Sequence, residues 1–181
     1  MNTTLILSIV SASVRMAVPL LLIALAELYS EKAGMVNIGL EGLAAIGALV
    51  GFMVTYYTGN TWLGILGAAV AGILINLIYA FSTISLCANH IVYGMAMNIL
   101  APALASFIYR ISFGVGNSLT QIELMKPIEI SILSKIPYIG ELVFHQTPMV
   151  YLAFLMVPLT SVFFQKTKMG LNYKSVGEYP K

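Results

Sequence analysis

The sequence has 181 residues and a formal net charge of +2, with 59% hydrophobic and only 9% charged residues. An ordinary soluble domain carries about 25% charged residues, so this composition leaves too few charged groups to cover a water-soluble surface. The small net charge gives no indication of nucleic-acid binding, and the single cysteine, Cys87, excludes an intramolecular disulfide.

Five apolar blocks predict five transmembrane helices, because about 20 residues at 1.5 Å each cross a hydrocarbon core of about 30 Å. The first block is expected to be a retained span rather than a cleaved signal, since no basic residue precedes it and Arg15 interrupts it. Pro158 is expected to kink the last block. The predicted fold class is all-α, a polytopic membrane protein. The predicted helices cover residues 4–28, 38–57, 62–86, 91–109 and 148–164.

Polar stretches divide the chain further. Residues 1–164 form the predicted transmembrane domain, which contains an extracytoplasmic loop at 111–147. Residues 165–181 form a predicted cytoplasmic coupling segment. It stays open at this point whether 29–40 and 128–136 re-enter the membrane.

The lysines and arginines between the apolar blocks predict the orientation, since cytoplasmic segments carry an excess of these residues. Five of them share the side of the C-terminal tail and three lie on the other side, which places the C-terminus in the cytoplasm and the N-terminus outside. The five are Lys32, Lys166, Lys168, Lys174 and Lys181, and the three are Arg110, Lys126 and Lys135.

Small residues recur along the second and third predicted helices. Lipid supplies no hydrophobic drive between helices, so close backbone approach at small residues is a main source of packing energy. We therefore predict helix contact faces at these positions. They are Gly39, Gly42 and Gly47 in the second helix and Gly64, Gly67, Ala68, Ala71 and Gly72 in the third.

The residues that enzymes and metal sites need are scarce. The sequence contains no aspartate, and its two histidines, His90 and His145, are far apart and predicted on opposite sides of the membrane. A histidine-based metal site needs more ligands than this. No glycine-rich phosphate loop followed by Lys and Ser or Thr occurs, so a partner chain must hydrolyse any ATP. We expect no catalytic residue, no metal and no cofactor.

Four polar residues within the spans need an account, because such side chains are costly in hydrocarbon unless they face protein or water. Arg15, Glu41, Asn76 and Asn98 are therefore candidates for a substrate pathway. Structural alternatives stay open: Arg15 can bond backbone carbonyls, Glu41 can bond the 34–39 turn, and the asparagines can bond across helices. The predicted depths of Arg15 and Glu41 differ by on the order of 15 Å, which argues against an ion pair unless 29–40 re-enters the membrane.

The tail predicts a short cytoplasmic helix bounded by Gly170 and Gly177, with Leu171 and Val176 as apolar contacts. The alternative is a solvated basic tail after the last span, and composition alone favours that alternative.

Three stretches together resemble the permeases of nucleoside, riboflavin and simple-sugar ATP-binding-cassette importers, the branched-chain-type inner-membrane translocators. The first joins residues 15–21 (RMAVPLL) to residues 30–42 (SEKAGMVNIGLEG). The second is 88–98 (ANHIVYGMAMN), and the third is 170–180 (GLNYKSVGEYP), which is similar to the loop that docks on the ATPase. The sequence departs from the usual pattern at Lys174, where arginine is common.

The resemblance implies a permease subunit in the cell's inner membrane. Its partners would be an ATP-binding-cassette ATPase, a second permease subunit and an extracytoplasmic substrate-binding protein, with ATP hydrolysed by the partner subunit. The subunit would import a nucleoside-like or other small polar solute by alternating access. The ATPase-coupling residues would be Gly170, Leu171, Tyr173, Lys174, Gly177 and Glu178.

The family's members are usually longer, and this sequence stops where the docking loop would lead into further helices. The sequence therefore predicts a shortened or split permease. The alternative is a non-transporting membrane scaffold or assembly subunit, or an inactive permease remnant. An intramembrane enzyme is the weakest reading, because the acid, base and metal ligands are missing.

Overall fold

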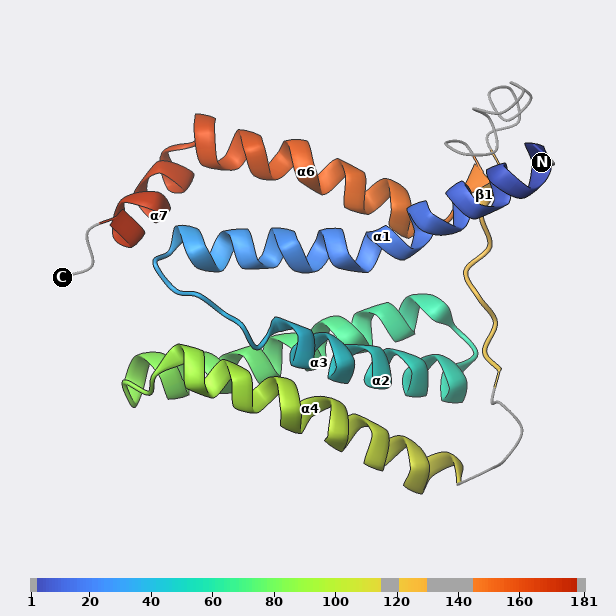
Figure 1. The fold of residues 1–181 in the computed structure, drawn as a ribbon, viewed down its shortest axis with the longest axis horizontal. Helices are drawn as coiled ribbons and strands as arrows, with labels where there is room; N and C mark the ends of the chain where they lie inside the picture. Colours follow the sequence, from blue (N-terminus) through green and yellow to red (C-terminus); the bar gives the residue numbers. More distant parts are fainter. Residues whose placement is uncertain (1–2, 115–120, 130–144, 179–181) are drawn as a thin grey trace. The chain divides into compact units, whose positions relative to one another are not determined.

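The computed structural model describes residues 3–114, 121–129 and 145–178. Helices dominate this part, together with one π-helical turn and one pair of two-residue strands (Figure 1). In it, five helices are long and apolar enough to cross a membrane, which confirms the predicted fold class. The elements are α1 (Thr3–Lys32), α2 (Leu40–Thr58), α3 (Thr61–Ala80), η1 (Phe81–Ser85), α4 (His90–Phe113), β1 (Ile128–Glu129), β2 (His145–Gln146), α6 (Pro148–Lys166) and α7 (Lys168–Glu178).

Several predicted helix ends are wrong, because hydropathy locates the hydrocarbon layer whereas a helix continues until its backbone is capped. The first helix continues past residue 28 to Lys32. The fourth helix continues to Phe113, so the segment 111–147 begins as helix rather than as loop. Its end is set by Gly114, which has φ 83° and whose N–H bonds the carbonyl of Arg110 at 2.9 Å.

The third predicted helix, which was expected to reach residue 86, has two parts. α3 ends at Ala80 and continues as the π-helical turn η1, in which the N–H of Leu86 bonds the carbonyl of Phe81 at 3.2 Å. Such a turn lengthens the spacing by one residue and often marks a special site. Cys87 follows with φ 51°, which ends the helical path before α4.

Two other expectations concern a re-entrant segment at 128–136 and a kink at Pro158. Of 128–136, only Ile128 and Glu129 are described, and they form β1, antiparallel to β2; residues 130–136 lie outside the described residues. α6 continues through Pro158 without a break in its helical assignment. The kink there stays a prediction.

The chain divides into two compact units. One is drawn from Met1–Gly34 and Met125–Lys181 and contains α1, the strand pair, α6 and α7. The other, Met35–Leu124, contains α2, α3 and α4.

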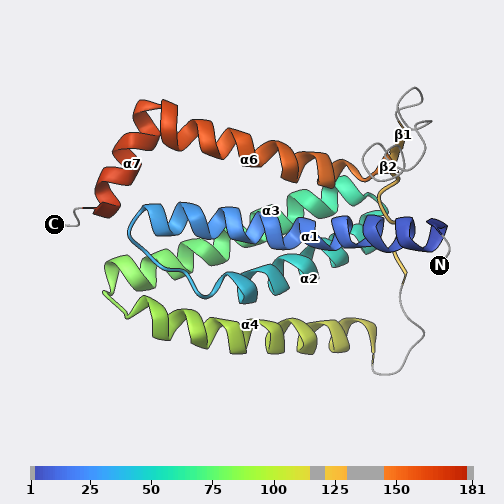
Figure 2. The ribbon, with the colours of Figure 1, turned by 45° about the horizontal axis from the view of Figure 1, so that its top comes forward.

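In the first unit, α1 and α6 lie side by side (Figures 1 and 2). Val18 of α1 packs with Val150 and Ala153 of α6 to form its buried apolar core. Beyond the start of α6, the side-chain amide of buried Gln146 donates to the hydroxyl of Ser11 at 2.9 Å. These contacts join the two helices near the β2 end of α6.

In the second unit, α2 packs against both α3 and α4. The α2–α3 contact is made by small residues: a Cβ atom built on Gly64 would overlap the hydroxyl of Thr55 and lie 2.7 Å from the carbonyl oxygen of Gly51. Gly67 meets Val54 in the same way, at 2.9 Å. The predicted contact face is therefore confirmed at Gly64 and Gly67.

The prediction of a contact face is wrong at Gly72 within the described ranges, where no atom lies within 4 Å of a Cβ built on this residue. Gly39 and Gly42 do belong to a contact face, but their neighbours are in α4. The pattern of small residues thus indicates close approach without indicating which helix approaches.

This difference between two glycines of the same helix gives a first test. Gly64→Ala is expected to destabilise the chain by about 1 to 3 kcal/mol, because the new methyl group meets backbone that cannot move aside. Gly72→Ala is expected to leave stability unchanged or raise it by about 0.5 to 1 kcal/mol, because alanine is the better helix former. Thermal unfolding in mild detergent measures both variants. Equal unfolding midpoints would contradict the α2–α3 packing.

Candidate functional site

The chain turns sharply between α6 and α7, and Thr167 makes the turn. Its hydroxyl donates to the carbonyl of Phe163 at 2.6 Å and accepts from the N–H of Gly170 at 3.0 Å. Its carbonyl accepts from the N–H of Leu171 at 3.1 Å. One threonine therefore ends α6 and caps the start of α7, which fixes the direction of α7.

The prediction that Gly170 and Gly177 bound the tail helix is wrong, because α7 runs from Lys168 to Glu178 and includes both. They are points of close approach instead. A Cβ on Gly170 would overlap the carbonyl oxygen of Phe163 and lie 2.9 Å from Phe164 Cα. The helix therefore begins in direct backbone contact with the end of α6.

Gly177, two helical turns after Gly170, makes the corresponding contact with the end of α1. A Cβ there would overlap the carbonyl oxygen of Lys32 and lie 2.8 Å from the nitrogen of Gly34 and 3.0 Å from the carbonyl carbon of Ala33. Only a residue without a side chain fits this approach. α7 is thus a brace held at one end by α6 and at the other by α1.

Aromatic side chains fill the space between these two contacts. The ring of Tyr29 lies 4.8 Å from that of Phe164 and 6.4 Å from that of Tyr173, measured between centroids. The hydroxyl of Tyr173 donates to the backbone carbonyl of Tyr29 at 3.0 Å. Tyr173 therefore holds α7 against α1, while its predicted contact with a partner stays a prediction.

Apolar side chains on the rest of α7 are not covered by other described residues. Met169, Leu171 and Val176 are 77%, 54% and 64% exposed, although all three are apolar. Lys174 and Glu178 form an ion pair of 3.7 Å on exposed side chains, which contributes little to stability. The helix is thus bonded to α1 and α6 within the chain, while three of its apolar side chains stay exposed in the described structure.

In the second unit, Asn98 of α4 joins the start of α2. Its side-chain oxygen accepts from the N–H of Gly42 and its amide donates to the carbonyl of Ile38, both at 2.7 Å. Gly42 is the third residue of α2, whose N–H has no partner within the helix. Asn98 of α4 thus caps α2, which agrees with the structural alternative that the asparagines bond across helices.

The turn before α2 is bonded by Asn37 rather than by Glu41. The side-chain oxygen of buried Asn37 accepts from the N–H of Gly39 at 3.1 Å. Glu41 is exposed in the first turn of α2. A Cβ on Gly94 would lie 2.9 Å from the nitrogen of Gly39, so α4 approaches this turn backbone to backbone.

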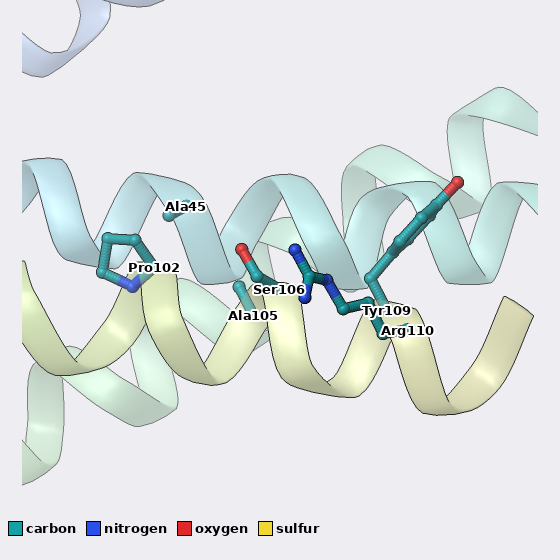
Figure 3. Close-up of a pocket in the computed structure, with 6 residues that line it drawn as sticks. All are labelled: Ala45, Pro102, Ala105, Ser106, Tyr109 and Arg110. Carbon is teal, nitrogen blue, oxygen red and sulfur yellow. The ribbon is translucent and has the colours of Figure 1, made fainter. Parts of the chain in front are cut away.

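A cavity of about 380 Å³ lies between α2 and α4 in the same unit. Figure 3 shows the side chains of Ser106 and Arg110 rising from α4 on the same side, one turn apart, with Tyr109 farther along. Ala45 of α2 and Pro102 of α4 line the other end. Hydroxyl and guanidinium donors beside an aromatic ring and apolar walls are typical of sites for small polar solutes.

The four predicted pathway residues belong to two units, Arg15 to the first and Glu41, Asn76 and Asn98 to the second, so a common pathway stays a prediction. Arg15 is exposed on α1 in the first unit, whereas Asn76, also exposed, lies on α3 in the second. The separation of Arg15 and Glu41 stays a prediction, since they belong to different units. Within the described ranges, no three His, Cys, Asp or Glu side chains lie close enough together to hold a metal ion.

Sequence reasoning missed Tyr29, Asn37 and Thr167 as structural residues and Ser106 and Arg110 as cavity residues. Asn and Thr directly before a helix are cap signals, so Thr167 could have been recognised. The role of Tyr29 depends on contacts with α6 and α7, about 130 residues later, for which no local signal exists.

Comparison with known proteins gives one family that matches almost the whole chain, described as "Branched-chain amino acid transport system / permease component", over residues 9–181. A glucose ABC transporter permease protein of Haloferax volcanii, so named, is 39% identical over 176 residues, which are 95% of this chain and 52% of that protein. No solved structure matches the chain.

Two further relatives carry nucleoside names. The nucleoside ABC transporter permease protein of Lactococcus lactis is 35% identical over 99% of this chain and 59% of its own length. The guanosine ABC transporter permease protein of Bacillus subtilis is 36% identical over 95% of this chain and 56% of its own length. The chain therefore spans between about half and three fifths of the curated relatives it matches.

Proposed function

The chain belongs to the family of branched-chain amino acid transport system permease components, and from this premise we propose that it is a permease subunit of an ATP-driven importer. It works by alternating access and leaves ATP hydrolysis to a separate ATP-binding-cassette ATPase. Its proposed partners are that ATPase, a second permease subunit and an extracytoplasmic substrate-binding protein. It lies in the cell's inner membrane with its N-terminus outside and its C-terminus in the cytoplasm.

The observation that carries this proposal is that α7 is fixed to two long helices and still exposes apolar side chains. The helix is fixed to α1 and α6 through Gly170, Tyr173 and Gly177. Met169 and Val176 lie next to these residues on the helix and are exposed in the described structure. A short helix that is bonded to two long helices transmits a movement of its partner to both of them as a rigid body. The exposed apolar side chains form the surface on which the ATPase would rest.

The proposed solute is a nucleoside-like or other small polar molecule. Relatives are named for glucose, nucleosides and guanosine, all of which carry hydroxyl groups. The cavity with Ser106, Tyr109 and Arg110 offers donors for hydroxyls and a ring for stacking. Arg15, Glu41 and Asn76 remain pathway candidates, whereas both polar groups of Asn98 are engaged by α2.

A pull-down tests the coupling role. The chain is co-expressed with the candidate ATPase from its own genome and purified in mild detergent. The double variant Met169→Glu with Val176→Glu is expected to reduce capture of the ATPase at least about tenfold, because two charges replace apolar contacts at the proposed interface. The control Leu124→Glu places a charge at an exposed apolar residue outside α7 and should leave capture unchanged.

Two results would contradict the proposal. Equal capture by all variants would show that α7 is not the contact surface. Absence of capture by the intact chain would favour the alternative function, a non-transporting scaffold or assembly subunit.

A further inference from the structure

A second cavity, of about 350 Å³, lies within the first unit where α1, α6 and α7 meet. Its size is within the range of about 300 to 1,000 Å³ that is usual for small-ligand sites. Its lining changes in character along the helices. Leu25, Leu28 and Val157 line it on the membrane side of the helix ends, and Lys32 and Lys174 line it nearest those ends.

This gradient follows from the spacing of residues on α1. Leu25, Leu28 and Lys32 are separated by three and four residues, so they share one face of the helix. At 1.5 Å per residue, Lys32 lies about 10 Å farther along the axis than Leu25. α6 repeats the order with Val157, followed by Gln165 near its end. The cavity is therefore apolar at one end and cationic at the other.

The cationic end carries no compensating charge in its lining. In the part of the chain that the structure describes, no acidic side chain lines the cavity. Among the described residues, the carboxylate of Glu178 lies 3.7 Å from the lining residue Lys174, but it is exposed, so water and salt weaken the pair. Both lysines are available to an anion.

We propose that this cavity binds the phosphate-bearing headgroup of an anionic membrane lipid. The lysines bind the phosphate, and the leucine side accommodates the glycerol and the first acyl carbons. Basic pockets at the cytoplasmic ends of transmembrane helices are suited to such headgroups. A free phosphate ion uses the lysines equally well but gains nothing from the leucines, so the apolar wall favours the lipid.

The position of the cavity gives the lipid a structural role. Lys32 is the last residue of α1 and Lys174 is in the middle of α7, so one phosphate bridges the two helices. This bridge adds to the contacts at Gly177 and Tyr173. The lipid would therefore hold α7 in place, which under the proposed function links the lipid composition of the membrane to coupling.

The site can be tested on the purified chain in nanodiscs of phosphatidylcholine, with or without phosphatidylglycerol. Native mass spectrometry after mild detergent extraction measures the phosphatidylglycerol that stays bound. We expect the wild type to retain it and the double variant Lys32→Gln with Lys174→Gln to retain it on the order of tenfold less. Lys32→Arg with Lys174→Arg should restore retention, which separates the charge requirement from a folding defect.

The control removes the same charge elsewhere. Lys166 and Lys168 are exposed at the α6–α7 turn and do not line the cavity, so Lys166→Gln with Lys168→Gln should retain the lipid as the wild type does. Equal loss in both glutamine variants would overturn the site in favour of general surface attraction. A third arm adds inorganic phosphate to phosphatidylcholine nanodiscs. If phosphate raises the unfolding temperature as much as phosphatidylglycerol does, the lipid assignment is overturned.

Discussion

Gly177→Ala is expected to detach the last turn of α7 from the end of α1 and to abolish capture of the ATPase. The added methyl group would meet three backbone atoms, those of Lys32, Ala33 and Gly34, at 3.0 Å or less. Backbone at a helix end cannot move aside as a flexible side chain can, so the cost is about 1 to 3 kcal/mol. That cost is large against the few contacts that hold an 11-residue helix.

The direction of this result is informative because helix propensity predicts the reverse. Within an isolated helix, glycine to alanine stabilises by about 0.5 to 1 kcal/mol. Hydrogen exchange of the α7 amides measures the docking directly, and faster exchange is expected in the variant. Asn172→Ala, on the exposed side of the same helix, is the control and should exchange as the wild type does. Unchanged exchange in Gly177→Ala would show that α7 does not need this contact.

Gly177 also shows what sequence reasoning can and cannot supply. The existence of a short helix near residues 170–177 was predictable from its local pattern and from the resemblance to a family. The meaning of its glycines was not, since glycine read locally indicates a helix end. Its actual neighbours, Lys32 and Gly34, are about 145 residues earlier in the chain. No short-range pattern carries that information.

For the transmembrane helices, too, some features were predictable from the sequence and others were not. Their number and approximate positions follow from hydropathy, because the bilayer imposes a length that the chain must match. Their ends do not, since they depend on local bonds such as that of Gly114 to Arg110. The π-helical turn at Phe81–Ser85 was likewise invisible, because one extra residue per turn leaves composition unchanged.

The aromatic residues near the end of α2 illustrate a third case. The sequence alone leaves two interpretations open for Phe52 and Tyr56, a stacking site for a ring-shaped solute or an anchor at the membrane interface. In the structure they pack on Phe113 of α4, with centroids 5.5 Å and 5.0 Å away. Offset and edge-on pairs of this kind add to helix association beyond the area they bury. Both rings thus contribute to the packing of α2 against α4.

Asn98→Leu is expected to destabilise the second unit, whereas Asn76→Leu is not. Leucine at 98 removes both bonds of 2.7 Å and leaves the N–H of Gly42 and the carbonyl of Ile38 without the side chain that satisfies them. Gly42 is buried, and leaving a buried N–H unsatisfied costs about 1 to 3 kcal/mol. Asn76 is exposed on α3, which is part of a candidate membrane span, so its side chain would face lipid or another subunit. Leucine is favourable in lipid.

The measured quantity is the unfolding midpoint in mild detergent, followed by uptake in the assembled importer. A helix cap and a solute contact predict different combinations of the two. If Asn98 caps α2, its loss lowers the midpoint by several degrees, and uptake falls because less folded subunit is present. If Asn98 instead contacts the solute, uptake falls while the midpoint stays unchanged. The two short bonds, to the backbone of Gly42 in α2 and of Ile38 just before it, favour the first combination, because the oxygen and the nitrogen of the amide are both engaged.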